Sequence, residues 1–235
     1  MITLARGGGT ALIAFADVGD LVAVENDGAS VVSVTGPMDD QDDYAAVAEA
    51  LCLVGSRTKA SISVGKLVPF DEGLGGTAPL VAASLRILKR APGPQPAPDV
   101  DVLGTNVFAC LASRAATLSE GAVFTASLPA LHAVLVHGGG KAGTDVGVDL
   151  PDAPTDWGTA REVAQWLRAL PLDVEDELAE VIDELAMAPG CLMARPSAAG
   201  GTCYGLFPDR STAEGAAAHL AKLHPAWWVE AATLT

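Results

Sequence analysis

The alternation of apolar and polar residues in the first third of the chain predicts short β-strands. Apolar runs rich in β-branched residues occupy positions 11–15, 21–24 and 30–34. Between the last two runs, Asn26-Asp27-Gly28 has the composition of a tight turn. The pattern therefore predicts an antiparallel sheet in this region.

The following stretch changes from helical to strand periodicity and back. An acidic run at 39–43 precedes apolar residues at helical spacing, and carboxylates favour the positive end of a helix. Residues 60–68 alternate like a strand, and the glycine-rich loop 73–76 then opens into a predicted helix that ends near Arg90. Four prolines in residues 91–98 exclude a helix there and indicate a linker or a replaced segment.

The C-terminal half contains further strands and amphipathic helices. Strands are predicted at 131–136, 191–195, 202–207 and 227–232, and helices at 159–170, 174–187 and 212–223. Strands and helices are grouped rather than strictly alternating, which is typical of an α+β fold with antiparallel sheets and packed helices. We expect two lobes, an N-terminal one over 1–118 and a C-terminal one over 119–235.

Composition narrows the classes of protein to consider. The 235 residues are 50% hydrophobic and 18% charged, which excludes extensive disorder. No apolar run is long enough to span a membrane and the first residues lack the layout of a secretory signal, so we expect a cytoplasmic protein with no membrane partner. The formal net charge of −15 disfavours nucleic acid as a partner.

The cysteines and histidines give no sign of a metal site. The four cysteines are dispersed without a C-x-x-C pair, and no histidine follows at ligand spacing. We therefore expect reduced thiols and no bound metal.

Five passages occur in an order and at intervals that are typical of one family. They are Phe15-Ala16-Asp17-Val18-Gly19-Asp20, Lys66-x-x-Pro69-x-x-x-Gly73-Leu74-Gly75-Gly76, Leu103-Gly104-Thr105-Asn106-Val107, Gly201-Thr202-Cys203-Tyr204-Gly205-Leu206-Phe207 and His224-Pro225-x-Trp227-Trp228-Val229. Through them nearly the whole chain resembles the 4-diphosphocytidyl-2-C-methyl-D-erythritol kinases of the GHMP kinase superfamily. The resemblance implies a two-lobed GHMP-kinase-like fold, ATP with magnesium as phosphoryl donor, and a cytidine-bearing alcohol as acceptor in non-mevalonate isoprenoid synthesis.

The resemblance also implies catalytic groups that this chain replaces. The family's opening motif carries a lysine beside the catalytic carboxylate and a Gly-Tyr-His that helps to hold the cytosine, whereas residues 6–10 here read Arg-Gly-Gly-Gly-Thr. Asn106 stands at the position of the family's catalytic aspartate, and an amide accepts no proton at a working pH. General base catalysis typically contributes about 10²- to 10⁴-fold, so its loss costs roughly 3 to 5 kcal/mol of barrier.

The candidate phosphate-binding residues are Gly73, Gly75, Gly76 and Thr77, because glycines let backbone N–H groups at a helix N-terminus approach an anion. When the loop is matched to the family motif without gaps, Thr77 replaces a glycine and Ala78 replaces a serine. Pro79 has no N–H group to donate to a phosphate. Leu80 replaces an aspartate, and Asp71 and Glu72 bring negative charge toward a polyanion. A tight strand-to-helix connection without a ligand is the alternative interpretation of this loop.

The third family motif, Ser-Gly-Ser-Gly, becomes Ser197-Ala198-Ala199-Gly200, which makes Ser197 and Gly200 the remaining candidate contacts to a nucleotide.

Two hypotheses about the function of the chain follow. In the first, the chain is a pseudokinase, a degenerate paralogue that binds a small phosphorylated or nucleotide-like ligand or a protein partner. In the second, it is a working small-molecule kinase that uses Mg-ATP with Asp71, Glu72 or Asp101 as a relocated base. The simultaneous changes at several motif positions favour the pseudokinase hypothesis. We therefore assign no cofactor, and expect Mg-ATP to bind only if kinase activity remains.

Overall fold

The computed structural model describes residues 1–25, 27–29, 31–38, 48, 51, 60–70, 74, 76–90, 100–119, 122–139, 150, 156–172, 174–198 and 200–235. The predicted helix after the acidic run 39–43 and the proline-rich stretch 91–98 lie almost entirely outside this set. The chain forms two compact units, Met1–Val18 with Arg114–Thr235, and Gly19–Ser113.

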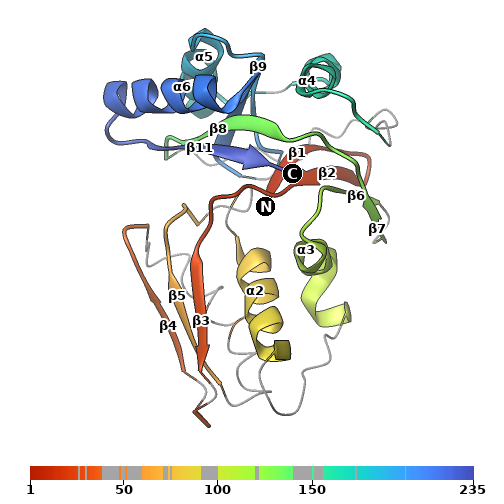
Figure 1. Ribbon diagram of the computed structural model, residues 1–235, viewed down its shortest axis with the longest axis vertical. Coiled ribbons are helices and arrows are strands. Elements are labelled where there is room, and N and C mark those ends of the chain that lie inside the picture. The colour runs from red at the N-terminus through yellow and green to blue at the C-terminus, as the bar shows by residue number, and fades with distance from the viewer. Residues whose placement is uncertain are drawn as a thin grey trace. The chain divides into compact units, whose positions relative to one another are not determined.

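The first unit contains two four-stranded antiparallel sheets (Figure 1). One has the order β1-β2-β6-β7 and consists of β1 (Ile2–Gly7), β2 (Thr10–Ala14), β6 (Ala116–Ser119) and β7 (Ala122–Thr125). The other has the order β11-β8-β10-β9 and consists of β8 (Leu131–His137), β9 (Met193–Pro196), β10 (Thr202–Phe207) and β11 (Trp228–Leu234). The N-terminal strands belong to this unit because β2 pairs with β6, whereas the division expected at residue 118 placed them in the N-terminal lobe.

Three helices are described in the first unit, and local sequence signals set their ends. They are α4 (Ala160–Ala169), α5 (Asp176–Met187) and α6 (Arg210–Leu223), close to the predicted ranges. The Thr159 side chain accepts a hydrogen bond from Glu162 N at the start of α4, and Asp209 accepts one from Thr212 N at the start of α6. Such caps satisfy amide groups that have no partner within the helix.

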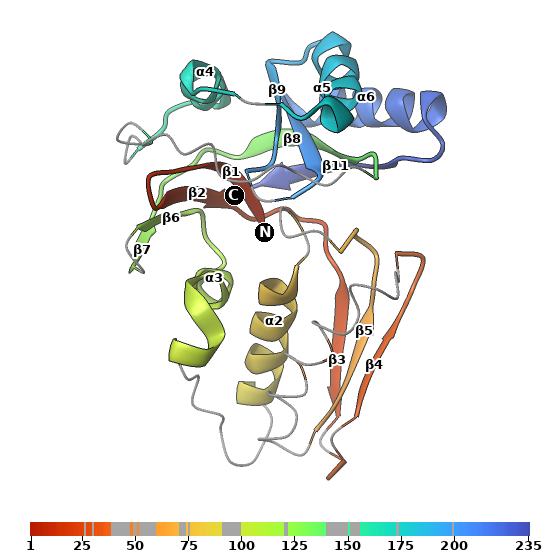
Figure 2. The ribbon, with the colours of Figure 1, turned by 180° about the vertical axis from the view of Figure 1, so that it is seen from behind.

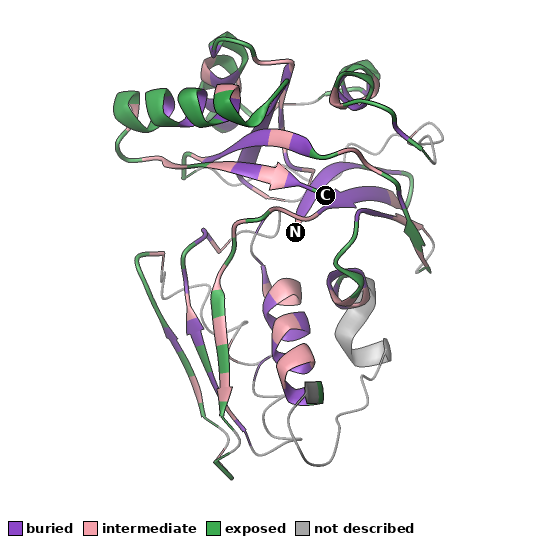
Figure 3. Ribbon diagram, viewed as in Figure 1, coloured by how far each residue is buried: buried purple, intermediate pink, exposed green. Residues whose placement is uncertain are grey.

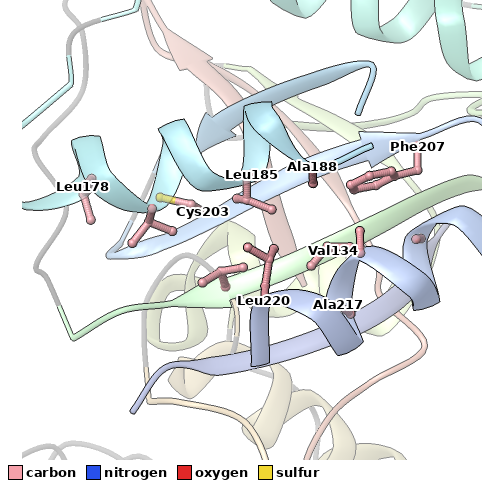
Figure 4. Packing of buried hydrophobic residues seen from close by; sticks show 12 residues of the cluster. Val134, Leu178, Leu185, Ala188, Cys203, Phe207, Ala217 and Leu220 are labelled. Carbon is pink, nitrogen blue, oxygen red and sulfur yellow. The ribbon is translucent and has the colours of Figure 1, made fainter. Parts of the chain in front are cut away.

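The core of the first unit lies between α5, α6 and the sheet that contains β8 and β10. β10 is buried along its whole length, as is most of β8, whereas α5 and α6 expose their outer faces (Figure 3). In Figure 4, Leu185 from α5 and Leu220 from α6 lie close to Val134 of β8, and all three belong to one buried cluster. The hairpin of β9 and β10 and the final strand β11, all predicted from the sequence, form the rest of this sheet.

Two buried polar contacts tie β1 and α4 to this unit. The hydroxyl of Tyr204, fully buried on β10, donates to the carbonyl oxygen of Leu4 at an irregularity in β1 (Oη to O 2.7 Å). The buried guanidinium of Arg195 donates to the carbonyl oxygens of Leu167, Leu170 and Pro171 at the end of α4. Cations favour the C-terminal end of a helix, so this guanidinium fixes α4 against β9.

The second unit consists of a three-stranded sheet and two described helices. Its elements are β3 (Leu21–Glu25), β4 (Val32–Thr35), β5 (Ser61–Gly65), α2 (Thr77–Arg90) and α3 (Val100–Ala112). Figure 2 shows the three strands side by side with α2 next to β3, and α2 also packs against α3. The helix α3 was not predicted from the sequence.

The strand order corrects the pairing expected around Asn26-Asp27-Gly28. β3 and β4 are not neighbours, because β5 lies between them, antiparallel to β3 and parallel to β4. The Asp27 carboxylate accepts hydrogen bonds from the Ser61 hydroxyl and from Ala29 N. The turn residues thus join the chain to β5 rather than closing a hairpin of adjacent strands.

Candidate functional site

The approach to the glycine-rich loop is fixed by a buried ion pair. At the end of β5, Lys66 Nζ lies 2.6 Å from Asp20 Oδ2, and the exposed fractions of the two side chains are 3% and 4%. The other carboxylate oxygen accepts hydrogen bonds from Leu67 N (2.8 Å) and Val68 N (3.1 Å). Lys66 Nζ also lies 5.5 Å from the centre of the Phe70 ring, a favourable cation–π distance. Asp20 therefore holds the three residues that begin the path from β5 to the loop.

The described part of the loop leads directly into a helix. Gly73 and Gly75 lie outside the described residues, whereas Gly76 is buried and Thr77 is the half-buried first residue of α2. The first turn of α2 contains no acidic residue, so its N-terminus keeps the positive end of the helix dipole. Pro79 removes one of the amide groups that this turn would otherwise present to an anion.

Asn106 lies on α3 and is exposed. The neighbouring residues Val107, Ala109 and Cys110 are buried, and Arg86 of α2 donates from its guanidinium to the carbonyl oxygen of Leu111. The helix is therefore fixed against α2 while the Asn106 side chain faces solvent. Its amide group can donate and accept hydrogen bonds but has no proton-accepting role near neutral pH.

The Ser197–Gly200 turn lies in the first unit and makes internal contacts. Ser197 is buried; its hydroxyl donates to the carbonyl oxygen of Thr3 (3.1 Å) and its N–H donates to that of Thr202 (2.7 Å). Ala198 N donates to the same Thr3 oxygen (3.0 Å), and Gly200 has a φ of +139°, which favours glycine. The hydroxyl predicted to contact a nucleotide thus donates its proton to β1.

The comparisons with known proteins bear on these same segments. The family model for the GHMP kinase C-terminal region matches residues 155–226. The chain is 34% identical over 95% of its length to the 4-diphosphocytidyl-2-C-methyl-D-erythritol kinase of Cereibacter sphaeroides, covering 89% of that protein. It is 33% identical over 97% of its length to the enzyme of the same name from Dinoroseobacter shibae, covering 88% of it. The chain belongs to the 4-diphosphocytidyl-2-C-methyl-D-erythritol kinase family.

Solved structures agree on the fold. A crystal structure of 4-(cytidine 5'-diphospho)-2C-methyl-D-erythritol kinase superimposes with a TM-score of 0.67 over 99% of this chain and 96% of that one, at 23% identity. A homoserine kinase from Cytophaga hutchinsonii superimposes with a TM-score of 0.55 over 94% of this chain and 87% of that one, at 17% identity. The α+β, GHMP-kinase-like fold expected from the sequence is therefore confirmed.

Membership of the kinase family makes the connection between β1 and β2 informative. This connection is a tight turn in which Gly8 and Gly9 have φ values of +55° and +77°, and Gly7 pairs directly with Thr10. Gly8 and Gly9 present no side chain in the region to which the family resemblance assigns the Gly-Tyr-His.

The structure places the candidate residues in two groups. Gly76, Thr77 and Asn106 lie in the second unit, on or beside the packed helices α2 and α3, and Ser197 and Gly200 lie in the first. Asp71, Glu72 and the side chain of Asp101, the candidate relocated bases, fall outside what the structure describes. Within the described residues, no group of three His, Cys, Asp or Glu side chains is arranged to hold a metal ion.

The ion pair between Asp20 and Lys66 was missed as a pair, although both residues belong to passages that resemble the family. The available signal was a lysine at the end of an otherwise alternating apolar strand, since buried lysines require a partner. No helix in the described part of the chain has both the length and the apolar character needed to cross a bilayer.

Proposed function

We propose that this member of the 4-diphosphocytidyl-2-C-methyl-D-erythritol kinase family has lost, or retains only weakly, the ability to transfer a phosphoryl group. We propose further that it acts as a paralogue that binds a small phosphorylated or nucleotide-like ligand, or a protein partner. The main support is Asn106, an exposed amide on α3 where the family resemblance places the catalytic aspartate. Without a substitute base, transfer by the family route would slow by about 10²- to 10⁴-fold.

Three carboxylates are described near the start of the second unit; Glu25 is exposed at the end of β3, and the other two, Asp20 and Asp27, already accept hydrogen bonds within the unit. Asp20 is buried and already bound to Lys66 Nζ and two backbone amides, and Asp27 accepts from Ser61 and Ala29. A general base must be within hydrogen-bond reach of the hydroxyl that it deprotonates, directly or through one water. The Asp20 and Asp27 carboxylates are committed to holding backbone and side chains of their own sheet.

Weak nucleotide binding is supported independently by the groups that would contact phosphates. Pro79 lacks an N–H in the first turn of α2, and the Ser197 hydroxyl donates to Thr3. Each hydrogen bond to a charged group is worth about 1.5–3 kcal/mol, so the loss of two lowers affinity substantially. Weak ATP binding and slow transfer would then have separate causes.

The proposal is tested by comparing this chain with the Cereibacter sphaeroides relative in parallel assays. Turnover is measured with 4-diphosphocytidyl-2-C-methyl-D-erythritol and Mg-ATP, and thermal unfolding is followed with and without Mg-ATP. We expect the relative to turn over and this chain to show turnover at least about 10²-fold slower. A ligand present at 100 times its Kd adds about 2.7 kcal/mol of stability, whereas a ligand present below its Kd adds very little. Because we propose weak ATP binding, we expect Mg-ATP to leave the unfolding temperature of this chain almost unchanged.

Turnover comparable to that of the relative would contradict the proposal and support a relocated base. In that case, substituting Asp71, Glu72 and Asp101 one at a time by the corresponding amide identifies the base. A strong stabilisation by Mg-ATP without turnover would keep the loss of transfer but exclude weak nucleotide binding.

A further inference from the structure

The chain passes from one compact unit to the other twice, between Val18 and Gly19 and between Ser113 and Arg114. Relative motion of two domains is absorbed by the few residues that join them when the residues on either side are fixed in their own domain. The contacts that flank each crossing therefore decide where such motion is possible.

At the first crossing, both flanks are anchored by an aspartate. Asp17 N donates to the carbonyl oxygen of Thr233 (3.1 Å), and Asp17 Oδ1 accepts from Thr233 N (2.7 Å), so Asp17 is fixed to the end of β11. Three residues later, Asp20 is fixed in the second unit by the ammonium group of Lys66 and by the backbone amides of Leu67 and Val68. Val18 and Gly19 alone separate the two anchors.

Gly19 has the freedom that such a position needs. It is exposed, and a Cβ built on it would meet no atom within 4 Å. Glycine also has the widest choice of backbone conformations. A rotation at Gly19 therefore meets little steric resistance from its surroundings.

At the second crossing, the anchors are the end of α3 and the start of β6. Ser113 N donates to the carbonyl oxygens of Ala109 and Cys110, and Ser113 has a φ of +47°, a left-handed conformation that ends the helix. On the other side, Ala115 is buried and its carbonyl oxygen accepts from Ala126 N (2.8 Å). Arg114 is the exposed residue between these two anchors.

We propose that Val18–Gly19 and Arg114, the two short segments that join the units, form a hinge about which the two units reorient while each keeps its own structure. The hinge is short because hydrogen bonds of Asp17, Asp20, Ser113 and Ala115 fix the chain immediately before and after each crossing. The inference rests on these anchors and does not depend on whether the chain transfers a phosphoryl group.

Residual dipolar couplings of backbone amides test the hinge without any assumption about how the units are placed. Couplings from each unit are fitted to that unit alone, which gives one alignment tensor per unit. We expect the two tensors of the wild-type chain to differ in magnitude, because a mobile joint averages the two units unequally. We expect Gly19→Pro, which restricts φ at the hinge, to bring the two magnitudes together, whereas Gly19→Ala, which meets no neighbouring atom, reduces the difference only slightly.

Each of the following results would overturn the hinge. Equal tensors in the wild-type chain would show that the units form one rigid body in solution. Different tensors that remain equally different in Gly19→Pro would place the flexible joint elsewhere. If Gly19→Pro disturbs the amide chemical shifts of β3 or β11, Asp17→Ala is used instead. This variant removes the carboxylate that accepts from Thr233 N, and it should enlarge the difference between the two tensor magnitudes. An unchanged difference in Asp17→Ala would again contradict the hinge.

Discussion

Asp20 and Lys66 form an ion pair that is almost fully enclosed, with 2.6 Å between Oδ2 and Nζ. Removing one member of a buried pair leaves the other charge without compensation, which costs about 3–5 kcal/mol. We expect Asp20→Ala to lower the free energy of unfolding by this amount, because it also removes the hydrogen bonds that Asp20 accepts from Leu67 N and Val68 N. Urea denaturation followed by circular dichroism measures the change.

The matched control is the exposed pair of Arg210 and Glu214, whose side chains are 67% and 55% exposed. Solvent and salt screen such pairs, so Glu214→Ala should cost less than about 1 kcal/mol. If Asp20→Ala cost no more than Glu214→Ala, the buried pair would not be a main support of the second unit.

Gly138 follows β8 at a point where α5 and Trp227 approach closely. A Cβ at this position would lie 2.8 Å from Val181 Cγ2 and 3.4 Å from Trp227 Nε1, and Trp227 is itself stacked on His224 at 3.7 Å. We expect Gly138→Ala to destabilise the first unit by about 1–3 kcal/mol, as overpacking does, because the buried Val181 side chain would have to shift.

Gly215 provides the opposite case within the same unit. It lies within α6 and an added Cβ would meet no atom within 4 Å. Gly215→Ala should therefore raise the free energy of unfolding by about 0.5–1 kcal/mol, since glycine is a poor residue inside a helix. Thermal and urea unfolding of the two variants side by side check both signs, and destabilisation by Gly215→Ala would contradict the packing described for α6.

The buried thiol of Cys110 predicts a loss of stability at alkaline pH. Burial on α3 raises the pKa of Cys110 to about 11, whereas an unfolded cysteine has a pKa of about 8.5. Between these two pKa values the Cys110 thiol loses its proton in the unfolded chain but keeps it in the folded chain. Its contribution to the free energy of unfolding is therefore complete below the unfolded pKa and is lost as the pH rises toward 11.

Cys110→Ala separates this contribution from those of other groups. Its free energy of unfolding is compared with that of the wild type from neutral pH up to the alkaline range. The difference should shift in favour of the variant by about 2 to 3 kcal/mol across that range. A difference that does not change with pH would show that Cys110 ionises equally easily in both states.

Asn106→Asp tests whether one substitution accounts for the proposed loss of transfer. We expect this variant to gain little turnover with Mg-ATP, because Thr77 and Ala78 also depart from the family pattern at the phosphate side. The triple variant Asn106→Asp, Thr77→Gly, Ala78→Ser should gain more than the sum of the separate changes, since groups that act as a unit are not additive. Full recovery with Asn106→Asp alone would mean that the nucleotide side of the site is intact.

Elements with local signals were predicted closely. Helices α4 and α6 begin at residues capped by Thr159 and Asp209, and their apolar faces recur at helical spacing, so the relevant interactions join residues three or four apart. The hairpin of β9 and β10 is local in the same sense. By contrast, the sequence of α3 is apolar over much of its length, with little separation of apolar from polar residues, and the helix was not recognised; it packs against α2.

The sequence by itself determined the kinase family, the α+β class and the residues that depart from the family pattern at Asn106, Thr77 and Ala198, because these follow from the order and identity of residues along the chain. Only the tertiary structure decided that β5 lies between β3 and β4, that Asp20 pairs with Lys66, and that the Ser197 hydroxyl donates to Thr3. Ser197 and Thr3 are 194 positions apart. Contacts over such separations depend on how sheets and helices pack together, and no periodicity or motif along the chain records them.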